Sequence, residues 1–591
     1  MNGILDRLLR RGCNGVREVR IDVAWLCCLA LLLFATGIGL RDPWPADEPR
    51  FALVARDMVA HHSWLIPQVG NDNYADKPPL YFWVMASLLK LTGSLRFAFL
   101  VPSAIAGLGC IVLVYDLARR LWNRETGLIA ALALLATLQF VWQPRQGQID
   151  ATLCFFTTLS LYGLLRHCLC GPAWRWYVIG WAAAGLGIIT KGVGFLPLLV
   201  LIPYFLLRAP RWQPRPELSG QASRWALGPL ALLVAVSIWL VPMLIAAHDD
   251  PVLRSYRDEI LFKQTWGRYF HPWHHLEPPW FFIADVIPVM WLPLTALLPW
   301  LIPRWWRSLR EHDLRSALLL VWIVTVVMFF TFSEGKRGIY VLPAVPALAL
   351  ACAPWLNDIA HRRRAQQTMF VVTCSVAAIC VAAGTALALS AHEQERFRVT
   401  YEVNPLALIG PLLAVGVCVA LVCSIARPAR GFAAYGVTIV ASLLVIGFWL
   451  DPMANDERSG ARFMRHVQAM TSDVRELGLV AYKEDYLLNA TRSVTTFGHA
   501  RWREAEQEAD DAAAWLAAAP GRVLLVDQRT RERCFATAHA QVVDARWTLV
   551  RGAANPSCVA KGRLSAALFY EPNETEVESK KQSAYAAVRD R

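Results

Sequence analysis

The chain has 591 residues, of which 56% are hydrophobic and only 18% are charged, a composition outside the range of soluble globular proteins. Its formal net charge is +13, but most of the excess lies in short arginine clusters between apolar segments, where positive charge sets membrane topology. Nucleic-acid binding is therefore not expected, and the composition indicates an integral membrane protein.

Hydrophobic segments long enough to cross a bilayer recur along the first three quarters of the chain. They predict about thirteen transmembrane helices, at residues 21–40, 97–117, 127–142, 151–165, 176–190, 193–207, 225–247, 280–302, 317–332, 339–355, 369–389, 406–425 and 433–450. The first segment is long and lacks a small-residue cleavage pattern, so we expect it to remain as a span rather than to be removed as a signal peptide. Residues 1–454 form the expected transmembrane domain.

The loop after the first span, residues 41–96, is long and is expected to carry two amphipathic juxtamembrane helices. Residues 48–61 place an apolar face at helical spacing, with Arg56 and Asp57 off that face. Such a helix fits the surface of a membrane. A second helix is expected at 80–91, directly after two prolines, because proline suits the first turn of a helix.

The distribution of arginines predicts the orientation of the chain in the membrane. The first twenty residues carry five arginines, which keeps the N-terminus in the cytoplasm by the positive-inside rule. Every second loop after that is also rich in arginine. With an odd number of spans, the segment after residue 454 then lies on the exterior side, together with the loops that hold Asp47, Glu48 and Asp150.

The C-terminal part of the chain changes character and is expected to be a small exterior α/β domain, residues 455–572. The hydrophobic patterning predicts helices and strands, with helices at 461–470 and 510–518 and strands at 477–482, 522–526 and 547–551. Residues 573–591 are polar and charged and predict a disordered tail.

The chain contains 14 cysteines, without the repeated Cys-x-x-Cys pairs or Cys-His spacing of a metal site. Most fall in or near the predicted spans and are expected to be small apolar packing residues. Cys534 and Cys558 are the two that fall in the exterior domain. Because an exterior compartment is oxidising, we expect them to form a disulfide.

Four exterior loops concentrate polar side chains, and packing of the spans can bring these loops together. Carboxylates can act as bases or bind a metal, while lysine and arginine stabilise phosphate charge. Taken one at a time, each could equally be an ordinary solvated loop residue. In chain order the loops contribute Asp47, Glu48, Arg50, Tyr74, Asp76 and Lys77, then Arg145 and Asp150, then Lys263, Arg268, His271, His274 and His275, then Glu334, Lys336, Arg337 and Tyr340.

Short motifs in these loops resemble those of a known family, in the same order. Residues 44–52 read Trp-Pro-Ala-Asp-Glu-Pro-Arg-Phe-Ala, and residues 74–83 read Tyr-Ala-Asp-Lys-Pro-Pro-Leu-Tyr-Phe-Trp. Gly-Ile-Ile-Thr-Lys-Gly follows at 187–192, His-Leu-Glu-Pro-Pro-Trp at 275–280, and Gly-Lys with Tyr-Val-Leu within 335–342. The set resembles the bacterial lipid A 4-amino-4-deoxy-L-arabinose transferases, which use polyprenyl-phosphate sugars and are GT-C enzymes related to the protein O-mannosyltransferases. The Asp-Glu pair alone belongs to the wider superfamily, and the later motifs narrow the resemblance.

The resemblance implies a polytopic α-helical membrane protein, a GT-C type glycosyltransferase with a C-terminal periplasmic α/β domain, in the bacterial inner membrane. Such an enzyme moves aminoarabinose from undecaprenyl phosphate to lipid A phosphates on the periplasmic face. The changed outer-membrane charge gives resistance to polymyxin and other cationic peptides. The expected partners are the lipid-linked amino sugar, lipid A and the bilayer, with no nucleic acid, and the protein is expected to act as a monomer.

The resemblance also assigns roles to residues. Asp47 stands at the position of the family's catalytic acidic residue, Asp150 at a second acidic position, and Lys77 at a residue that contacts the carrier phosphate. Arg50 could equally be an ion-pair partner that only orients Asp47. The expected substrate-binding residues are Glu48, Arg50, Tyr74, Arg268, Lys336 and Tyr340.

The expected reaction is a single displacement with inversion at the anomeric carbon of a pentose. A lipid A phosphate has a second pKa of about 6, so it is ionised near neutral pH and needs little help from a base. Asp47 is therefore expected to position the acceptor or stabilise positive charge on the sugar, rather than to abstract a proton. A Ser or Thr acceptor would instead require a true base.

Clustered histidines beside acidic groups also raise the question of a metal, because imidazole and carboxylate together suit zinc. His275 is the best ligand candidate, since it alone falls on a family motif, with Asp76 as its partner. The family usually has glutamate where Asp76 stands, which shortens that side chain by one methylene. The expected reaction requires no cofactor. If a metal is bound, the motifs indicate zinc held by Asp76 and His275.

Two other functions remain open at this stage. One keeps the fold but transfers a hexose from a polyprenyl phosphate to protein. The other is a transporter of a polyprenyl-linked saccharide. A transporter should place its ionisable residues within the spans near the bilayer midplane, whereas here they gather in exterior loops, which favours chemistry on a lipid substrate.

Overall fold

The computed structural model describes most of the chain and divides it into two compact units. The described residues are 16–70, 72–207, 211–214, 216, 222–262, 276–333, 335–401, 405–498, 501–544 and 546–572. The helical unit comprises residues 1–41, 75–84 and 96–453, and the C-terminal unit comprises residues 42–74, 85–95 and 454–591. The two units differ in secondary structure, and each is described by itself.

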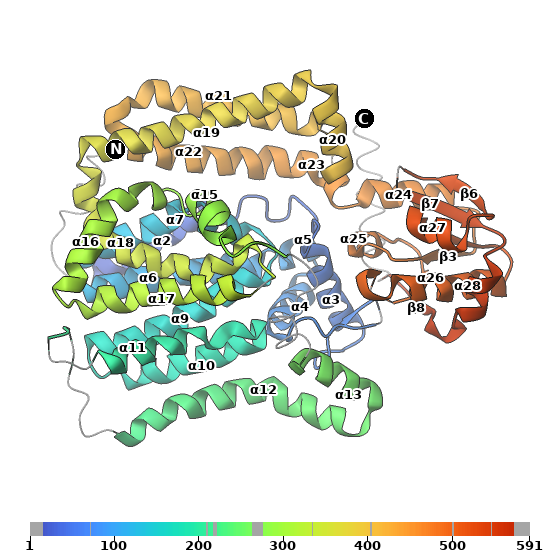
Figure 1. Ribbon diagram of the computed structural model, residues 1–591, viewed down its shortest axis with the longest axis horizontal. Helices are drawn as coiled ribbons and strands as arrows, with labels where there is room; N and C mark the ends of the chain where they lie inside the picture. The colour runs from blue at the N-terminus through green and yellow to red at the C-terminus, as the bar shows by residue number, and fades with distance from the viewer. Residues whose placement is uncertain are drawn as a thin grey trace. The chain divides into compact units, whose positions relative to one another are not determined.

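The helical unit consists almost entirely of helices (Figure 1). Its α-helices are α2 (Val16–Phe34), α6 (Val101–Leu121), α7 (Arg124–Ala136), α8 (Leu138–Trp142), α9 (Ile149–Cys170), α10 (Trp174–Lys191), α11 (Leu201–Leu206), α12 (Leu227–Asp249), α13 (Pro251–Asp258), α15 (Ile287–Met290), α16 (Leu298–Arg310), α17 (Leu314–Phe332), α18 (Val345–Ala360), α19 (Arg363–Leu389), α20 (Ala391–Tyr401), α21 (Leu406–Ala426) and α22 (Gly431–Val445). The 3-10 segments η2 (Val193–Val200) and η7 (Gly338–Ala344) lead into α11 and α18.

Many of these helices are long and apolar enough to cross a membrane. Among the described residues eight helices meet that condition, and two further pairs of helices meet it together but bend by 69° and 96° at a short break. The second pair, Phe282–Met290 with Thr295–Arg310, lies where a single straight span over 280–302 was predicted. The predicted number of about thirteen spans stays a prediction, and the chain is an integral membrane protein.

Helices α9 and α10 form an antiparallel hairpin, joined through Gly171–Ala173, and glycines let their backbones approach closely. A Cβ atom added to Gly163 would collide with the carbonyl oxygen of Trp176, and one added to Gly180 would lie 3.0 Å from the carbonyl oxygen of Ser160. Small residues at helix contacts are the usual means of close packing in membranes. The hairpin therefore holds the start of α9 beside the end of α10.

The C-terminal unit contains a six-stranded mixed sheet in the order β6-β7-β5-β3-β4-β8. Strand β3 pairs in parallel with both β4 and β5, whereas the pairs β4–β8, β5–β7 and β6–β7 are antiparallel. The strands are β3 (Glu476–Leu479), β4 (Val494–Thr496), β5 (Arg522–Asp527), β6 (His539–Val542), β7 (Trp547–Arg551) and β8 (Leu568–Tyr570). Helix α24 (Ala461–Met470) precedes the first strand of this sheet in the chain. The helices that follow β3 are α25 (Glu484–Leu488), α26 (Arg501–Ala518), α27 (Gln528–Cys534) and α28 (Pro556–Lys561).

The predicted C-terminal α/β domain is confirmed, and its predicted bounds, 455–572, stay a prediction. Strands were predicted at three places where β3, β5 and β7 occur, and α24 has the predicted bounds. Cys534 and Cys558 form a disulfide with a Cα–Cα distance of 5.8 Å. The tail predicted to be disordered, 573–591, lies outside the described residues.

The helix predicted at 48–61 forms as α3 (Glu48–Ala60), but its surroundings differ from those expected. Arg56 and Asp57, expected to lie on a polar face, are buried to 4% and 1% exposure. Arg56 donates to the carbonyl oxygens of Leu487 and Leu488 and to the Tyr570 hydroxyl, and the Asp57 carboxylate accepts from the Gly70 N–H at 2.7 Å. The expectation that Arg56 and Asp57 lie off the buried face of the helix was wrong, because both side chains are buried and hydrogen-bonded inside the C-terminal unit.

Candidate active site

Asp150 and Lys191 meet at the open end of the α9–α10 hairpin. Asp150 lies in the first turn of α9, Lys191 is the last residue of α10, and the Lys191 ammonium is 2.5 Å from an Asp150 carboxylate oxygen. Their side chains are 11% and 17% exposed. A carboxylate near a helix N-terminus and a cation near a helix C-terminus both interact favourably with the helix dipoles. The hairpin thus presents an ion pair rather than a lone carboxylate.

Tyr340 extends this pair into a three-residue cluster. The Lys191 ammonium lies 4.5 Å from the centre of the Tyr340 ring, a distance typical of a cation–π interaction. Tyr340 lies in η7, the irregular segment that leads into α18, and its ring also contacts Phe330 at 5.3 Å between centres. We call Asp150, Lys191 and Tyr340 the hairpin cluster. It combines a carboxylate, an ammonium and a phenol in the helical unit.

Lys336 is buried just before η7, to 4% exposure. Its ammonium donates to the carbonyl oxygen of Glu277 at 2.8 Å. Leu276 and Gly335 form an isolated antiparallel bridge beside it. The motif that contains Glu277 and the motif that contains Lys336 therefore lie side by side, although about sixty residues separate them in the chain.

Asp76 and Lys77 are half-buried residues of the helical unit. The Lys77 ammonium donates to the backbone carbonyl of Asp76 at 2.9 Å. Two prolines follow, and the helix α4 (Leu80–Thr92) begins directly after them, close to the predicted 80–91. The fixed backbone of this Pro-Pro segment holds Lys77 at the start of a helix.

Arg145, grouped by sequence with the polar loop residues, is buried to 4% exposure. Its guanidinium lies 3.4 Å from the carboxylate of Asp451 and 3.5 Å from the carbonyl oxygen of Thr36. The neighbouring Arg41 donates to the backbone carbonyl of Arg145 at 3.1 Å. Within the helical unit, Arg145 is therefore paired with Asp451, while Asp150 is paired with Lys191.

The acidic pair Asp47 and Glu48 belongs to the C-terminal unit and stands at the start of α3. Glu48 is 3% exposed, and its carboxylate accepts from the backbone N–H of Trp44 at 2.9 Å. Asp47 is half-buried and occupies the residue before the helix without capping it through its side chain. Glu48 thus fixes the backbone turn that presents Asp47.

Arg50 and Tyr74 also belong to the C-terminal unit. The Arg50 guanidinium donates to Glu484 on α25 at 2.7 Å, and the two side chains are 15% and 7% exposed. Tyr74 is buried to 3% exposure. Burial, followed by the charges of Glu484 and Asp57, raises the pKa of the nearby Tyr482 well above its usual value of 10. That phenol is therefore protonated near neutral pH and is not a base.

Two of the expected site residues, Arg268 and His275, lie outside the described residues, as do Lys263, His271, His274 and Glu334. Among the described residues, one group of side chains has the proximity of a metal site, and it consists of Asp510 with Cys534 and Cys558. Because those two sulfurs are bonded to each other, they are not thiolate ligands. Asp76 with His275 stays a prediction.

Sequence reasoning gave no site role to Lys191 or Glu484, the partners of Asp150 and Arg50. Lys191 had a signal, because it lies in the Thr-Lys-Gly motif and at the end of a span that follows Asp150 in the chain. Glu484 had none, because it lies 434 residues after Arg50. Among the described residues, the structure brings Asp150 and Tyr340 together through Lys191, and Lys336 to the adjacent motif.

Comparison with known proteins gives matches over much of the chain. Residues 76–241 match a family model described as dolichyl-phosphate-mannose-protein mannosyltransferase. A protein of Pseudomonas fluorescens named undecaprenyl phosphate-alpha-4-amino-4-deoxy-L-arabinose arabinosyl transferase 1 is 30% identical over 56% of this chain and 60% of its own length. A protein of the same name without the number, from Pseudomonas paraeruginosa, is 27% identical over 79% of this chain and 86% of its own length.

Among solved structures, the chain is similar to ArnT from Cupriavidus metallidurans bound to undecaprenyl phosphate, with a TM-score of 0.71 and 21% identity. That match covers 89% of this chain and 97% of the other. The apo state of the same protein gives a TM-score of 0.69. The predicted resemblance to the arabinosyl transferases is confirmed, and the chain has the fold of this solved structure. For several of the sequence relatives, the match spans less than two thirds of their length.

Proposed function

We propose that this chain, a relative of the undecaprenyl phosphate-aminoarabinose arabinosyl transferases that shares the ArnT fold, is an inverting glycosyltransferase. It moves 4-amino-4-deoxy-L-arabinose from undecaprenyl phosphate to phosphate groups of lipid A. The reaction takes place at the periplasmic face of the bacterial inner membrane, with the N-terminus in the cytoplasm and the C-terminal unit in the periplasm. The product carries an added amine, which lowers the negative charge of the outer membrane and gives resistance to polymyxin.

The observation that carries the proposal is the hairpin cluster, in which a carboxylate, an ammonium and a phenol meet at the open end of the α9–α10 hairpin. A partly buried group of opposite charges on a membrane protein is a candidate functional site. The cluster supports a lipid substrate that brings both a positive amino sugar and a negative phosphate. A carboxylate suits the first and cations suit the second.

The bonds that change can be stated from the chemistry of the two substrates. An oxygen of the lipid A phosphate forms a bond to the anomeric carbon as the bond from that carbon to the carrier phosphate breaks. Undecaprenyl phosphate leaves with the electron pair, and the anomeric carbon inverts. The acceptor is ionised near neutral pH, since its second pKa is about 6, so no base is required for attack.

The residues then divide by charge. Lys77, Arg268 and Lys336 stabilise the leaving phosphate, with Tyr74 and Tyr340 as hydrogen-bond donors to it. Asp47 and Asp150 stabilise the positive charge that develops on the sugar and hold its ammonium. Lys191 positions the Asp150 carboxylate by the ion pair at 2.5 Å. Glu48 and Arg50 hold the turn that presents Asp47, through Trp44 and Glu484.

No cofactor is part of this reaction. A zinc ion held by Asp76 and His275 would supply further positive charge for the phosphate. The charge assignments above stand without it, because the lysines and arginine already provide cations. Chelation with EDTA is therefore expected to leave most of the transfer activity, and complete loss with recovery on added zinc would make the metal essential.

Mass spectrometry of lipid A from cells with and without the protein tests the proposal. We expect lipid A to gain the mass of a pentosamine when the wild-type protein is present. Asp47→Ala is expected to abolish the gain while the protein still inserts in the membrane. Unchanged lipid A in the presence of wild-type protein would overturn the proposal, and full activity of Asp47→Ala would remove Asp47 from the reaction.

Transfer of a hexose to a protein hydroxyl is the second candidate, favoured by the description of the matching family model. That reaction needs a base to take the hydroxyl proton. Its product would be a glycosylated protein and unmodified lipid A. The same comparison of cells, extended to intact-protein mass spectrometry of periplasmic proteins, separates the two.

A further inference from the structure

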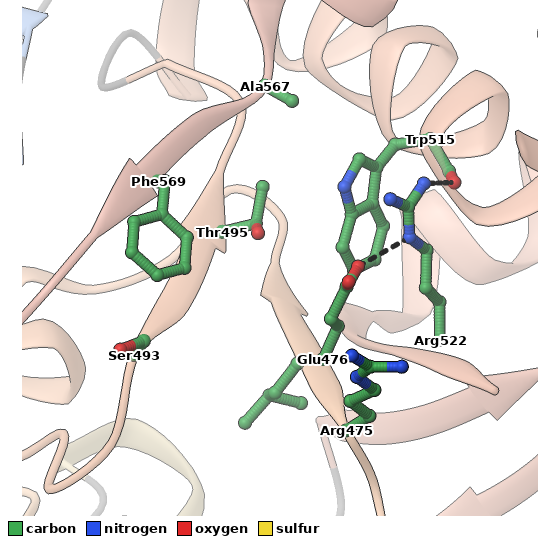
Figure 2. Close-up of a pocket in the computed structure, with 9 residues that line it drawn as sticks. Arg475, Glu476, Ser493, Thr495, Trp515, Arg522, Ala567 and Phe569 are labelled. Carbon is green, nitrogen blue, oxygen red and sulfur yellow. Dashed lines mark hydrogen bonds and ion pairs between the residues drawn. The ribbon is translucent and has the colours of Figure 1, made fainter. Parts of the chain in front are cut away.

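We propose that the C-terminal unit carries a separate binding site for a single anionic sugar unit, in a cavity at the amino ends of its parallel strands. The cavity has a volume of about 270 Å³ and is lined by residues from β3, β4, β5, β8 and α26 (Figure 2). It uses none of the residues given to the transferase reaction. Doubly wound sheets hold ligands beyond the carboxyl ends of their strands, so the fold alone does not predict this site.

Two buried side chains present unused hydrogen-bonding groups to the cavity. Trp515 on α26 is 5% exposed, and its indole N–H has no hydrogen-bond partner within the part of the chain that the structure describes. Thr495 on β4 is 8% exposed, and the same holds for its hydroxyl group. Figure 2 shows the Trp515 nitrogen and the Thr495 oxygen facing the central space. Because both atoms open onto the cavity, a ligand that enters it can accept a hydrogen bond from the indole and form another with the hydroxyl.

The charges around the cavity favour an anion. Arg522 is held in place, since its guanidinium pairs with Glu476 at 2.6 Å, donates to the Trp515 carbonyl oxygen and lies 4.4 Å from the centre of the Trp515 ring. Arg475, the residue directly before β3, is exposed, and no described residue forms an ion pair or hydrogen bond with it. Two guanidinium groups against one carboxylate leave a net charge of +1. A guanidinium with free donors binds a phosphate or a carboxylate in a bidentate manner.

The remaining walls favour a sugar over a bare ion. Phe569 on β8 lines the opposite side and is 60% exposed, so its ring offers an apolar face at the entrance. A sugar ring has an apolar C–H face for such a ring and hydroxyls for Thr495, Trp515 and the second oxygen of Glu476. The volume of about 270 Å³ is just below the roughly 300 Å³ at which drug-sized pockets begin, which limits the occupant to one ring.

Saturation-transfer NMR on the full-length protein in nanodiscs tests the site with four probes: glucose 1-phosphate, glucuronic acid, glucose and inorganic phosphate. We expect glucose 1-phosphate, glucuronic acid or both to bind at least about tenfold more tightly than glucose or phosphate alone. The stronger of the two identifies the anionic group. Equal binding of neutral glucose, equal binding of inorganic phosphate alone, or no binding of any probe would each overturn the proposal.

Three variants assign the binding to this cavity. Arg475→Glu is expected to weaken the anionic sugar at least about tenfold, and Thr495→Val and Trp515→Phe by about two- to tenfold each, because each loses one hydrogen bond. Arg529→Glu is the matched control, since Arg529 is an exposed arginine of the same unit outside the cavity. Equal weakening by Arg529→Glu, or none by Arg475→Glu, would place the binding elsewhere. Lipid A transfer is measured in parallel, so a failure of this site is distinguishable from a failure of the proposed reaction.

Discussion

Two ion pairs of similar burial occur in the two units, and they differ in what they connect. Asp150 and Lys191 are 41 residues apart and join the ends of one helical hairpin in the helical unit. Arg50 and Glu484 are 434 residues apart and join the first loop to α25 in the C-terminal unit. Burial and distance alone therefore do not distinguish a reactive pair from one that holds segments together. The distinction must come from whether breaking the pair changes the rate or the stability.

The largest effect is expected for Asp150→Asn. The substitution keeps the size of the side chain and a hydrogen-bond acceptor for Lys191, but it removes the negative charge proposed to face the sugar. Removing one such electrostatic group typically lowers kcat by about 10²- to 10³-fold. The change in kcat is measured as the rate of lipid A modification in membrane vesicles. The control is Asp249→Asn, because that side chain is 93% exposed at the end of α12. A loss of protein from the membrane, rather than of turnover, would assign Asp150 to structure.

The next effect is expected for Lys191→Gln. Without its ammonium partner the Asp150 carboxylate loses a charge-assisted hydrogen bond, which is worth about 1.5–3 kcal/mol. We expect the rate to fall by about ten- to a hundredfold, less than for Asp150→Asn, with partial recovery in Lys191→Arg. A positioning role predicts that the two single effects are not additive in the Asp150→Asn, Lys191→Gln double variant. Additive losses would mean that Lys191 contacts the substrate independently of Asp150.

For the Arg50–Glu484 pair in the C-terminal unit, we expect a loss of stability rather than a loss of turnover. Glu484→Gln removes the negative charge that accepts from the half-buried Arg50 guanidinium, and weakening this charge-assisted hydrogen bond costs about 1–3 kcal/mol. Hydrogen–deuterium exchange of the full-length protein should show faster exchange in α3 and α25. Glu457→Gln is the matched control, because its ion pair with Arg462 has side-chain exposures of 68% and 29% and exposed pairs contribute little. Unchanged exchange together with a large loss of turnover would move Arg50 from structure to substrate binding.

Sequence reasoning succeeded where one local pattern decides the structure. Hydropathy predicted a span at 406–425, observed as α21 (Leu406–Ala426), because a membrane helix must be apolar along its whole length. It failed to predict the bend of 96° between Met290 and Thr295, because hydropathy records composition and not direction. In the C-terminal unit, helical spacing predicted α3 but not the burial of Arg56, because Tyr570, its partner, is 514 residues away.

In the candidate site, too, the sequence predicts the contacts that follow from a local pattern and misses those between distant segments. The Asp150–Lys191 pair follows from the sequence once two consecutive spans are recognised as an antiparallel hairpin, since the start of one then lies beside the end of the next. The family motifs had already marked Asp150 and Tyr340, but they contain no distances. Glu484 and the cavity at Trp515 depend on contacts between distant segments of the C-terminal unit, and no spacing in the sequence encodes those contacts.

The smallest effect is expected for a third ion pair, Asp511 with Arg563, which responds to pH. Burial acts to raise the pKa of Asp511, but hydrogen bonds from the Arg563 side chain and backbone N–H outweigh it, and the pKa of the folded state is lowered. A lowered carboxyl pKa contributes stability above the unfolded value of about 3.9, which is lost as the pH falls through the folded value.

Arg563 is 61% exposed, and solvent screening limits the contribution of this pair to about 1 kcal/mol. Thermal unfolding of the C-terminal unit in the full-length protein, followed by circular dichroism with proteolysis of the 501–518 helix as a local readout, measures it. We expect the stability difference between wild type and Asp511→Asn to be present at neutral pH and to shrink as the pH falls below the unfolded value of about 3.9. A difference that persists at low pH would mean that Asp511 contributes through packing and not through its charge. In that case charge alone would not explain how the ion pairs of the C-terminal unit stabilise the fold. Only the turnover of the variants would then distinguish those pairs from the Asp150–Lys191 pair.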